Sequence, residues 1–384
     1  MKALIIGLGK SGRGAAKLLL KQGYEVCAVD REPQEVEGVS VYPEDTQIQA
    51  DLVVLSSGIP VTHPQAKGTV IGEAELALRE LKNRMVGVTG TNGKTTTVLL
   101  ITHVLNQAGI QARALGNVGN SLADYACNPD PDEVLVVELS SYQLETLHQK
   151  CFDVGLITNI TPDHLDRYPS FKAYRETKLR LKELVRKGGT FIMGGDSYLQ
   201  VTENERYWRV IGAELVHHAW QICEKFGVAL DVFNAALKTF KRPPHRMEIV
   251  DHVGGVTFIN DSKGTNIESV MYGVSQVEGP ILLIAGGQSK GETFEKWKER
   301  FPKKVKGVFA IGETAAEIEK ELIGVIPTAR CENMQDAVDK ALKEACAGDT
   351  VLLSPGCASF DQFKNFEERG EMFKEYIKKV RKQE

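Results

Sequence analysis

The sequence lacks any apolar run long enough to cross a membrane, for which about 20 residues are needed. It also lacks a signal-peptide pattern, because the apolar start runs directly into Gly-Leu-Gly-Lys-Ser-Gly. We therefore expect no membrane insertion. A basic excess is missing too, since 47 basic and 51 acidic residues give a formal net charge of −4. Proteins that mainly bind nucleic acid normally carry such an excess, so we expect no nucleic-acid partner.

The cysteines show no pattern of paired ligands or disulfides. The chain has seven of them, scattered and without a Cys-x-x-Cys pair. We therefore expect neither a disulfide framework nor a cysteine zinc site, and the pattern favours a protein of the reducing cytoplasm. Glycine, by contrast, is abundant: the 384 residues include 36 glycines, where average usage gives about 27. Glycine collects where backbone approaches a ligand closely.

Short apolar stretches alternate with helical stretches, which is typical of parallel sheets covered by helices. The length predicts two or three domains, and Pro243-Pro244 marks a boundary because proline ends helices. The predicted fold is α/β with a Rossmann-like N-terminal domain (1–84), a central P-loop ATPase-type parallel-sheet domain (85–242) and a C-terminal Rossmann-like domain (243–384). The charged residues 371–384 predict an amphipathic helix on the solvated surface. We expect strands at 3–6, 24–29, 52–55, 85–88, 134–137, 155–157, 256–259, 281–284, 307–311 and 351–353, and helices near 12–21 and 98–105.

The first glycine loop, GLGKSG at residues 7–12, fits G-x-G-x-x-G between a strand and a helix. Asp30 ends the next strand, at the spacing of a ribose-binding acid. Bare glycine backbone and the helix N-terminus can receive a diphosphate there. Three interpretations stay open at this point: the dinucleotide of a nicotinamide-dependent dehydrogenase, another nucleoside diphosphate, or a tight turn without a ligand.

The second glycine loop, GTNGKTT at residues 90–96, is the strongest local signal. It follows a strand and opens a helix, so backbone N–H groups would surround phosphates. Lys94 would reach the β- and γ-oxygens, and Thr95 would hold Mg²⁺. The loop is a shorter form of the usual motif, because Val88 stands where the longer spacing requires glycine.

Candidate metal ligands follow two neighbouring predicted strands. Glu138 ends one of them, and a carboxylate oxygen is a ligand that Mg²⁺ prefers. His164 follows the other, where a purely structural role is equally compatible with the sequence. Asp163 and Asp166 compete with His164 for the metal. All of these lie after parallel strands, at the sheet edge where such folds bind ligands.

These motifs together resemble one family. GTNGKTT, the acid in VVELSSYQLE (136–145) and NITPDHLDRYPS (159–170) are similar to those of the Mur ligases, ATP-dependent amide-forming enzymes of peptidoglycan synthesis. The C-terminal motifs narrow the resemblance to the members that add D-glutamate, and it spans residues 7 to about 370. These motifs are HRME (245–248), NDSKGTN (260–266), GGQSKG (286–291) and LSPGCASFDQFKNFEERG (353–370).

The resemblance implies a ligase that adds D-glutamate to UDP-N-acetylmuramoyl-L-alanine through an acyl phosphate, with ATP and two Mg²⁺ ions, in a cytoplasmic monomer. It assigns the first loop to the uridine diphosphate rather than to NAD. The sugar-nucleotide residues it implies are Gly9, Lys10, Ser11, Asp30, Arg31, Gly58 and Asn117. The ATP residues it implies are Gly90, Thr91, Asn92, Gly93, Lys94, Thr95, Thr96, Arg246, Asp261 and Lys263.

The resemblance also implies the catalytic, metal and amino-acid residues. Lys94, His164 and Lys178 would be catalytic, with Lys178 carbamylated; without the resemblance, Lys178 reads as a solvated helical lysine. His164 would deprotonate the amine or only position it. The metal residues would be Thr95, Glu138, His164 and Lys178. The D-glutamate residues would be Thr265, Lys290, Ser359, Phe360 and Phe366, although Phe366 could equally be a core aromatic.

One departure concerns the adenine. The family usually carries an HN-x-x-N stretch late in the central domain, and Gly212 and Leu215 stand at the asparagine positions here. The adenine pocket must therefore differ. The alternatives are another Mur-type ligase, a folylpolyglutamate-type ligase, a dehydrogenase, or a ligase-derived binding protein without turnover. The GLGKSG domain argues against folate ligases, and a dehydrogenase would leave GTNGKTT unexplained.

Overall fold

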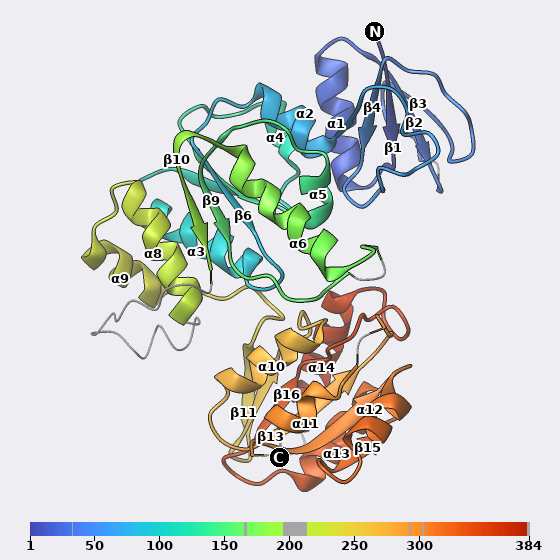
Figure 1. Ribbon diagram of the computed structural model, residues 1–384. Helices are drawn as coiled ribbons and strands as arrows, with labels where there is room; N and C mark the ends of the chain where they lie inside the picture. Colours follow the sequence, from blue (N-terminus) through green and yellow to red (C-terminus); the bar gives the residue numbers. More distant parts are fainter. Residues whose placement is uncertain (33, 165–166, 195–212, 292, 302, 382–384) are drawn as a thin grey trace. The chain divides into compact units, whose positions relative to one another are not determined.

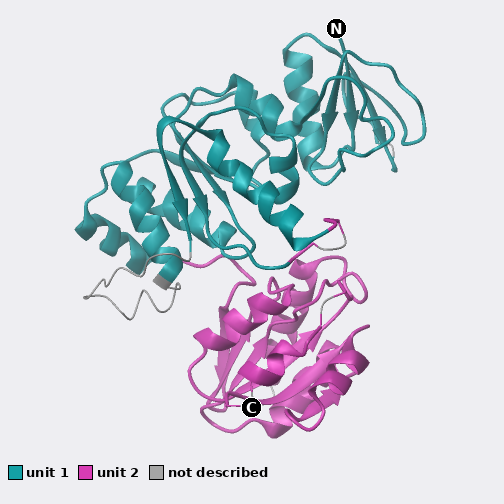
Figure 2. Cartoon of the chain, in the orientation of Figure 1, with its two compact units in different colours: residues 1–162, 170–240 teal, residues 163–169, 241–384 magenta. Residues whose placement is uncertain are grey.

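The computed structural model describes residues 1–32, 34–164, 167–194, 213–291, 293–301 and 303–381 (Figure 1). Three sheets with helices beside them form the described part, which confirms the predicted α/β class. The chain divides into two compact units, residues 1–162 with 170–240 and residues 163–169 with 241–384 (Figure 2). The sheets lie within residues 2–72, 85–193 and 248–353. The domain limits at 84/85 and 242/243 stay a prediction.

The first sheet has the order β3-β2-β1-β4-β5, and all of its neighbouring strands are parallel. Its central strands are apolar because helices and loops cover both faces, and Leu4 and Ile5 of β1 are completely buried. The elements are β1 (Lys2–Ile6), α1 (Lys10–Lys21), β2 (Glu25–Asp30), β3 (Val39–Pro43), β4 (Leu52–Leu55), β5 (Val70–Gly72) and α2 (Glu73–Glu80).

The second sheet is also parallel, in the order β10-β9-β6-β8-β7. Serine side chains cap three of its helices: Ser121 accepts from Asp124 at the start of α4, Ser140 from Gln143 at the start of α5, and Ser170 from Ala173 at the start of α6. The elements are β6 (Met85–Thr89), α3 (Lys94–Gln107), β7 (Ala112–Gly116), α4 (Leu122–Ala126), β8 (Val134–Glu138), α5 (Ser141–Glu145), β9 (Phe152–Ile157), α6 (Phe171–Leu179), the 3₁₀ helix η1 (Arg180–Leu184), β10 (Val185–Met193), α8 (Ala213–Lys225) and α9 (Leu230–Thr239).

The first two sheets share one apolar core inside the first unit. Leu18 of α1, Leu76 of α2 and Leu122 of α4 belong to the same buried cluster, together with Leu135 and Val137 of β8. Close approach is possible because Gly14 of α1 leaves space: a Cβ there would lie 2.3 Å from the hydroxyl oxygen of Ser121. The two glycine loops are therefore carried by one continuously packed body.

The third sheet has the order β11-β12-β16-β13-β14-β15, with β11 antiparallel to β12 and the other pairs parallel. Its elements make up most of the second unit. They are β11 (Glu248–Val253), β12 (Val256–Asn260), α10 (Ile267–Gln276), β13 (Ile281–Gly286), α11 (Lys296–Arg300), β14 (Val305–Ile311), α12 (Ala315–Leu322), β15 (Thr328–Arg330), α13 (Met334–Glu344), β16 (Thr350–Leu353) and α14 (Phe366–Arg381).

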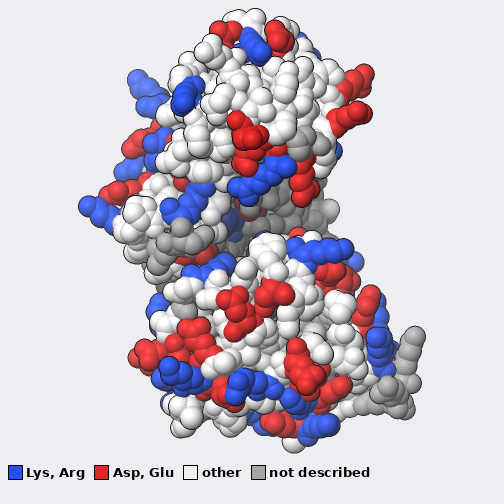
Figure 3. Space-filling model, turned by 90° about the vertical axis from the view of Figure 1, so that its right-hand side faces the viewer, with Lys and Arg blue, Asp and Glu red and all other residues white. Residues whose placement is uncertain are grey.

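One expectation was wrong in part. The C-terminal charged stretch forms α14, but Phe373 and Ile377 are completely buried in a cluster with Phe258 and Val351 of the third sheet. The helix is therefore a core element with one charged face. All seven cysteines are free. In the described ranges, no helix is both long and apolar enough to span a membrane. Basic and acidic side chains are interspersed on the face drawn in Figure 3.

Candidate active site

The second glycine loop joins β6 to α3 in a tight turn. Gly90 and Gly93 have φ values of +149° and +82°, which glycine adopts without a steric penalty. A Cβ on Gly90 would lie 1.9 Å from Oγ1 of Thr158, and one on Gly93 would lie 2.7 Å from Cδ2 of Leu215. The turn brings the N-terminus of α3 to the carboxyl edge of the sheet, where its N–H groups can bind phosphate.

The residues after β9 hold this loop in place. Asn159 accepts the N–H of Thr91 with its carbonyl and the N–H of Asn92 with its side-chain oxygen, both at 2.9 Å. The Thr158 hydroxyl donates to the carbonyl of Asn92 at 2.6 Å. The sequence analysis assigned no role to Asn159. The available signal was an asparagine directly after a buried strand, at the same sheet edge as the loop.

Two predicted lysines converge on the carbonyl oxygen of Gly90. Lys94 Nζ lies 2.9 Å from it and Lys178 Nζ lies 2.8 Å from it. Lys178 comes from α6, is 2% exposed, and has its Nζ 4.7 Å from the ring centroid of Tyr174. The solvated-lysine reading of Lys178 is therefore wrong. Thr95 is half-buried and Thr96 is buried, both in the first turn of α3.

Glu138 is the last residue of β8 and is 1% exposed. Its Oε1 accepts a hydrogen bond of 2.9 Å from the side-chain amide of Asn117, whose backbone N–H donates to the Glu138 carbonyl. Its Oε2 has no hydrogen-bond partner among the described residues. A buried carboxylate oxygen without a partner is destabilising, and a hard cation such as Mg²⁺ would satisfy it.

The described ranges contain no group of three or more His, Cys, Asp or Glu side chains that could hold a metal by itself. Mg²⁺ sites commonly use one or two protein carboxylates completed by substrate phosphates and waters. Glu138, with Thr95 at the start of α3, fits that pattern. His164 is assigned to the second compact unit, whereas Glu138, Thr95 and Lys178 belong to the first.

The first glycine loop joins β1 to α1 and needs glycine at two positions. Gly7 has a φ of +87°, and a Cβ on Gly12 would lie 1.9 Å from the carbonyl oxygen of Gly7. Gly9 is different, since a Cβ on Gly9 would have only one close neighbour, the hydroxyl oxygen of Ser56 at 3.9 Å. Packing therefore explains Gly7 and Gly12, whereas Gly9 leaves room beside the N-terminus of α1.

The other predicted sugar-nucleotide residues surround this loop. The hydroxyl oxygens of Ser11 and Ser56 lie 2.8 Å apart, which joins the loop to the 56–58 turn that contains Gly58. Asp30 accepts the N–H of Leu8 at 2.5 Å and that of Glu32 at 2.9 Å, so its carboxylate shapes the loop backbone. Arg31 pairs with Glu44, and Lys10 donates to the carbonyl of Gly119. Their contacts with a ligand stay predictions.

In the second unit, three motif loops follow β12, β16 and β13, which are neighbouring parallel strands. Asp261 is 7% exposed and accepts from Met247 N at 3.2 Å and from the Ser354 hydroxyl at 2.8 Å. Burial raises the pKa of Asp261 to about 6. Lys263 Nζ lies 3.8 Å from the ring centroid of Phe366. Phe366 is half-buried and contacts the rings and side chains of polar residues, Lys263 and His245, rather than an apolar cluster of the described residues.

The HRME segment has an unusual backbone. His245 and Met247 have φ values of +62° and +50°, which are uncommon outside glycine. Arg246 lies between them, and its charge opposes the rise in the pKa of Asp261 that burial causes. The His245 carbonyl also accepts the N–H of Lys263 at 3.0 Å. Such backbone strain is typical of functional sites. Here the strained segment contains Arg246 and contacts Asp261 and Lys263, the other two predicted ATP residues of this unit.

The predicted D-glutamate residues lie on the same loops. Thr265 and Lys290 are half-buried, Ser359 is 3% exposed and Phe360 is 69% exposed. Lys290 Nζ lies 3.8 Å from Oδ1 of Asp163. The amide of Asn266 donates to the other oxygen of Asp163 at 3.2 Å. A half-buried cation and a buried hydroxyl suit a dicarboxylate.

Asp163 competed with His164 as a metal candidate, which stays a prediction; in the structure its carboxylate lies beside Lys290 and His164. Burial alone would raise the pKa of its carboxyl, but Lys290 and His164 outweigh this and lower it. His164 has a φ of +55°, and its Nε2 lies 3.8 Å from Oδ2 of Asp163. Asp166 lies outside the described residues.

Arg369 is a functional candidate that the sequence analysis missed. It is completely buried in α14 and donates to the hydroxyl and carbonyl of Ser262 at 3.0 and 2.9 Å. It also donates to the carbonyls of Cys357 and Ala358 at 3.2 Å. Arg369 therefore ties the NDSKGTN loop to the residues directly before Ser359. Its position in the charged stretch FEERGE (366–371) gave no sign in the sequence that this arginine is buried.

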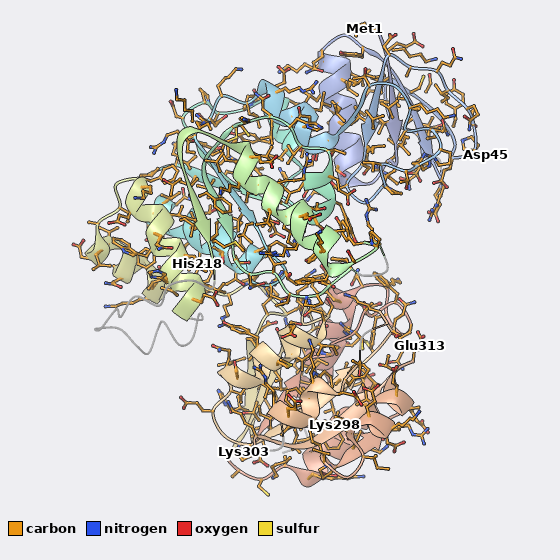
Figure 4. The ribbon with its side chains drawn as sticks, viewed as in Figure 1. Met1, Asp45, His218, Lys298, Lys303 and Glu313 are labelled. Atoms are coloured by element: carbon orange, nitrogen blue, oxygen red, sulfur yellow. The ribbon has the colours of Figure 1, made fainter. Side chains whose placement is uncertain are left out.

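Helix α8 contains Leu215, one of the two residues that stand where the family usually has the adenine-binding asparagines. Leu215 packs on Gly93 of the phosphate loop, and Gly212 lies outside the described residues. His217 and His218 follow on the same helix and are 8% and 4% exposed; Figure 4 labels His218. Burial lowers the pKa of His218 to about 4, so its ring is neutral near pH 7.

Comparisons with known proteins identify this arrangement. The Mur ligase middle domain matches residues 88–255, and the Mur ligase, glutamate ligase domain matches residues 245–357. The chain is 40% identical to the UDP-N-acetylmuramoylalanine–D-glutamate ligase of Protochlamydia amoebophila, with 98% of each chain covered. The chain belongs to the Mur ligase family. The enzyme of the same name from Alkaliphilus oremlandii is 35% identical, with 99% of this chain and 98% of that enzyme covered.

Solved Mur ligase structures confirm the fold. The MurF ligase of Thermotoga maritima, solved in complex with ADP, superposes with a TM-score of 0.64 at 16% identity and covers 98% of this chain and 95% of its own. The pseudomurein peptide ligase type C of Methanothermus fervidus gives a TM-score of 0.62 at 18% identity, with 99% and 100% covered. The predicted family and the predicted three-domain α/β ligase fold are thus confirmed.

Proposed function

We propose that this Mur ligase joins D-glutamate to UDP-N-acetylmuramoyl-L-alanine with ATP, giving ADP and phosphate, in cytoplasmic peptidoglycan precursor synthesis. The observation that carries the proposal is the 40% identity, over 98% of both chains, with an enzyme named for this reaction. The proposal includes a monomeric enzyme, as the family resemblance implies.

The proposed reaction has two steps. A carboxylate oxygen of the sugar nucleotide attacks the γ-phosphorus of ATP, the bond to ADP breaks, and an acyl phosphate forms. The amine of D-glutamate then attacks the acyl carbon, loses a proton, and phosphate leaves as the amide forms. Phosphorylation is needed because an oxide is a poor leaving group. Positioning and charge neutralisation supply most of the catalysis.

The residues of the second glycine loop would bind the ATP phosphates. Its N–H groups face the carboxyl edge of the sheet, and Lys94 would exchange its two loop carbonyls for phosphate oxygens. Arg246, Asp261 and Lys263 would complete the nucleotide contacts. Mg²⁺, when bound by Glu138 and Thr95, would neutralise phosphate charge. The proposal includes a second ion near His164 and Lys178.

Carbamylation of Lys178 belongs to the proposal, and the burial of its Nζ supports it. The neutral amine adds to the carbon of CO₂, a C–N bond forms, and a proton leaves to solvent. The product is an anion on a long arm, which suits a metal site better than an ammonium does. His164 would position the amine of D-glutamate or accept its proton.

The substrates at either end would use the remaining predicted residues. D-Glutamate would meet Lys290, Ser359 and Thr265, with Phe360 and Phe366 beside them. Since Lys290 already pairs with Asp163, a substrate carboxylate would compete with Asp163 for that charge. The sugar nucleotide would lie on the first glycine loop, with its diphosphate at the N-terminus of α1. Its contacts would come from Gly9, Lys10, Ser11, Asp30, Arg31, Gly58 and Asn117.

Phosphate release tests the proposed activity. The chain is incubated with ATP, Mg²⁺ and UDP-N-acetylmuramoyl-L-alanine, and each amino acid is added in turn. We expect release that requires D-glutamate. Equally fast release with L-alanine or meso-diaminopimelate would contradict the assignment and favour another Mur-type ligase.

The altered α8 favours one second candidate, a ligase-derived binding protein without turnover. Leu215 stands where the family has an asparagine, so the adenine lacks that partner. Such a protein would bind the sugar nucleotide but release no phosphate with any amino acid. Calorimetric binding of the sugar nucleotide, measured beside the phosphate assay, separates the two functions.

A further inference from the structure

The segment 117–123, which connects β7 to α4, is held by three tethers inside the first unit. Asn117 donates from its side chain to Oε1 of Glu138 and from its backbone to the Glu138 carbonyl. The Gly119 carbonyl accepts from Lys10 of the first glycine loop. The N–H of Ala123 donates to Oε1 of Glu73 at 2.7 Å. The segment thus joins the predicted metal-binding acid to the first glycine loop, which follows the central strand β1, and to the start of α2, which follows the edge strand β5.

The Glu73 tether is formed by a buried carboxylate whose pKa is raised. It is the first residue of α2 and is 2% exposed. Its carboxylate also accepts hydrogen bonds from the N–H of Leu122 and the hydroxyl of Ser121. Burial nevertheless raises the pKa of Glu73 to about 7, and within the described part of the chain only hydrogen bonds oppose this rise. Burying a carboxylate costs free energy, which the hydrogen bonds from the 122–123 backbone and from Ser121 offset only in part.

Packing alone would already dock α2 against α4. Leu76, Leu78 and Ala77 of α2 share the apolar cluster with Leu122 and Ala123. The Glu73 carboxylate fixes the orientation of the 117–123 segment rather than adding much to the packing, since it accepts a backbone N–H at the point where the segment enters α4. Movement of that end would be transmitted over a few residues to Asn117, and from there to Oε1 of Glu138.

We propose that Glu73 is a positioning residue for Glu138, acting through the 117–123 segment and Asn117. By holding the segment, Glu73 keeps the Asn117 amide on Oε1 and leaves Oε2 available to a cation. Outer partners of this kind orient metal ligands and tune metal affinity. The inference rests on the proposed function only in taking Glu138 as the acid that binds Mg²⁺.

A matched control lies two residues away. Glu75 is also 2% exposed and also in α2, but its Oε2 accepts the N–H groups of His148 and Gln149 at 2.8 and 3.0 Å. Its Oε1 pairs with Arg79. Glu75 therefore holds the same helix against a different part of the unit, and among the described residues it makes no hydrogen bond or ion pair with the 117–123 segment.

The test compares Glu73→Ala, Glu73→Gln and Glu75→Ala in the full chain. We expect Glu73→Ala to raise the Mg²⁺ concentration for half-maximal phosphate release by about tenfold, with the KM for D-glutamate within about twofold of wild type. Glu73→Gln keeps one acceptor oxygen and should restore the wild-type Mg²⁺ dependence. Glu75→Ala should lower thermal stability but leave the Mg²⁺ dependence of phosphate release unchanged.

Amide hydrogen exchange supplies a readout that does not depend on activity. We expect faster exchange in residues 117–123 for Glu73→Ala and unchanged exchange there for Glu75→Ala. Equal effects of both alanine variants, or an unchanged Mg²⁺ dependence in Glu73→Ala, would overturn the inference. Failure of the proposed function is distinguishable, because wild type itself would then show no D-glutamate-dependent release while the exchange comparison would still report on the tether.

Discussion

Gly12→Ala is expected to distort the first glycine loop. The new Cβ would lie 1.9 Å from the carbonyl oxygen of Gly7, so this carbonyl must recede by about 1 Å. Overpacking costs about 1–3 kcal/mol, and contact with backbone favours the upper end. Alanine regains about 1 kcal/mol over glycine in a helix. The net expectation is a free energy of unfolding lowered by about 2 kcal/mol.

The same displacement should weaken sugar-nucleotide use. A misplacement of about 1 Å can slow a reaction about a hundredfold, so we expect the KM for UDP-N-acetylmuramoyl-L-alanine to rise at least about tenfold while the KM for ATP is unchanged. Gly9→Ala is the control, because its Cβ has space and Gly9 has a φ of −63°. It should keep wild-type stability yet raise the same KM. If Gly12→Ala matched wild type in denaturant unfolding and in both KM values, the account of the loop would be refuted.

Lys94→Ala should lower phosphate release at least about a hundredfold without changing the melting temperature, since Lys94 is half-buried; full activity would remove the phosphate-loop assignment. Lys178→Ala should lose activity and regain part of it with formate or acetate, and no rescue by either would argue against a carbamate. Because burial raises the pKa of Glu73 from 4.5 to about 7, its contribution to stability is complete below pH 4.5 and is lost as the pH rises through 7. The loss amounts to about 3 kcal/mol. Glu73→Gln should flatten the dependence of unfolding free energy on pH in this window, and a retained slope would count against the assigned pKa.

The strands that the sequence predicted are those buried on both faces. β1, β6, β8, β13 and β16 read as continuous apolar runs because each lies inside a parallel sheet. Every strand that was missed lies at the edge of a sheet: β3, β5, β7, β10, β11 and β15. Edge strands such as β3 and β10 are largely half-buried or exposed, so their composition does not differ from that of loops. The pairing that makes them strands comes from their neighbours.

The candidate site divides in the same way. The glycine loops and Glu138 could be found because a strand, a loop and a helix follow one another in the chain. Glu73 and Arg369 could not, since their partners lie far away in sequence, at separations of 50 and 107 residues. Asn159 offered the signal of an asparagine directly after a buried strand, but its partner in the glycine loop lies 67 residues away. In the structure, the hydrogen bonds of all three residues hold loops in place. Such contacts exist only after the sheets have assembled.

Transfer of ¹⁸O tests the central claim most directly. UDP-N-acetylmuramoyl-L-alanine labelled with ¹⁸O in its carboxylate is converted with ATP and D-glutamate, and the released phosphate is analysed by mass spectrometry. Ligation through an acyl phosphate predicts one ¹⁸O atom in each phosphate, together with a D-glutamyl product of matching amount. Unlabelled phosphate, formed with or without D-glutamate, would show that water cleaves the ATP and would contradict the account.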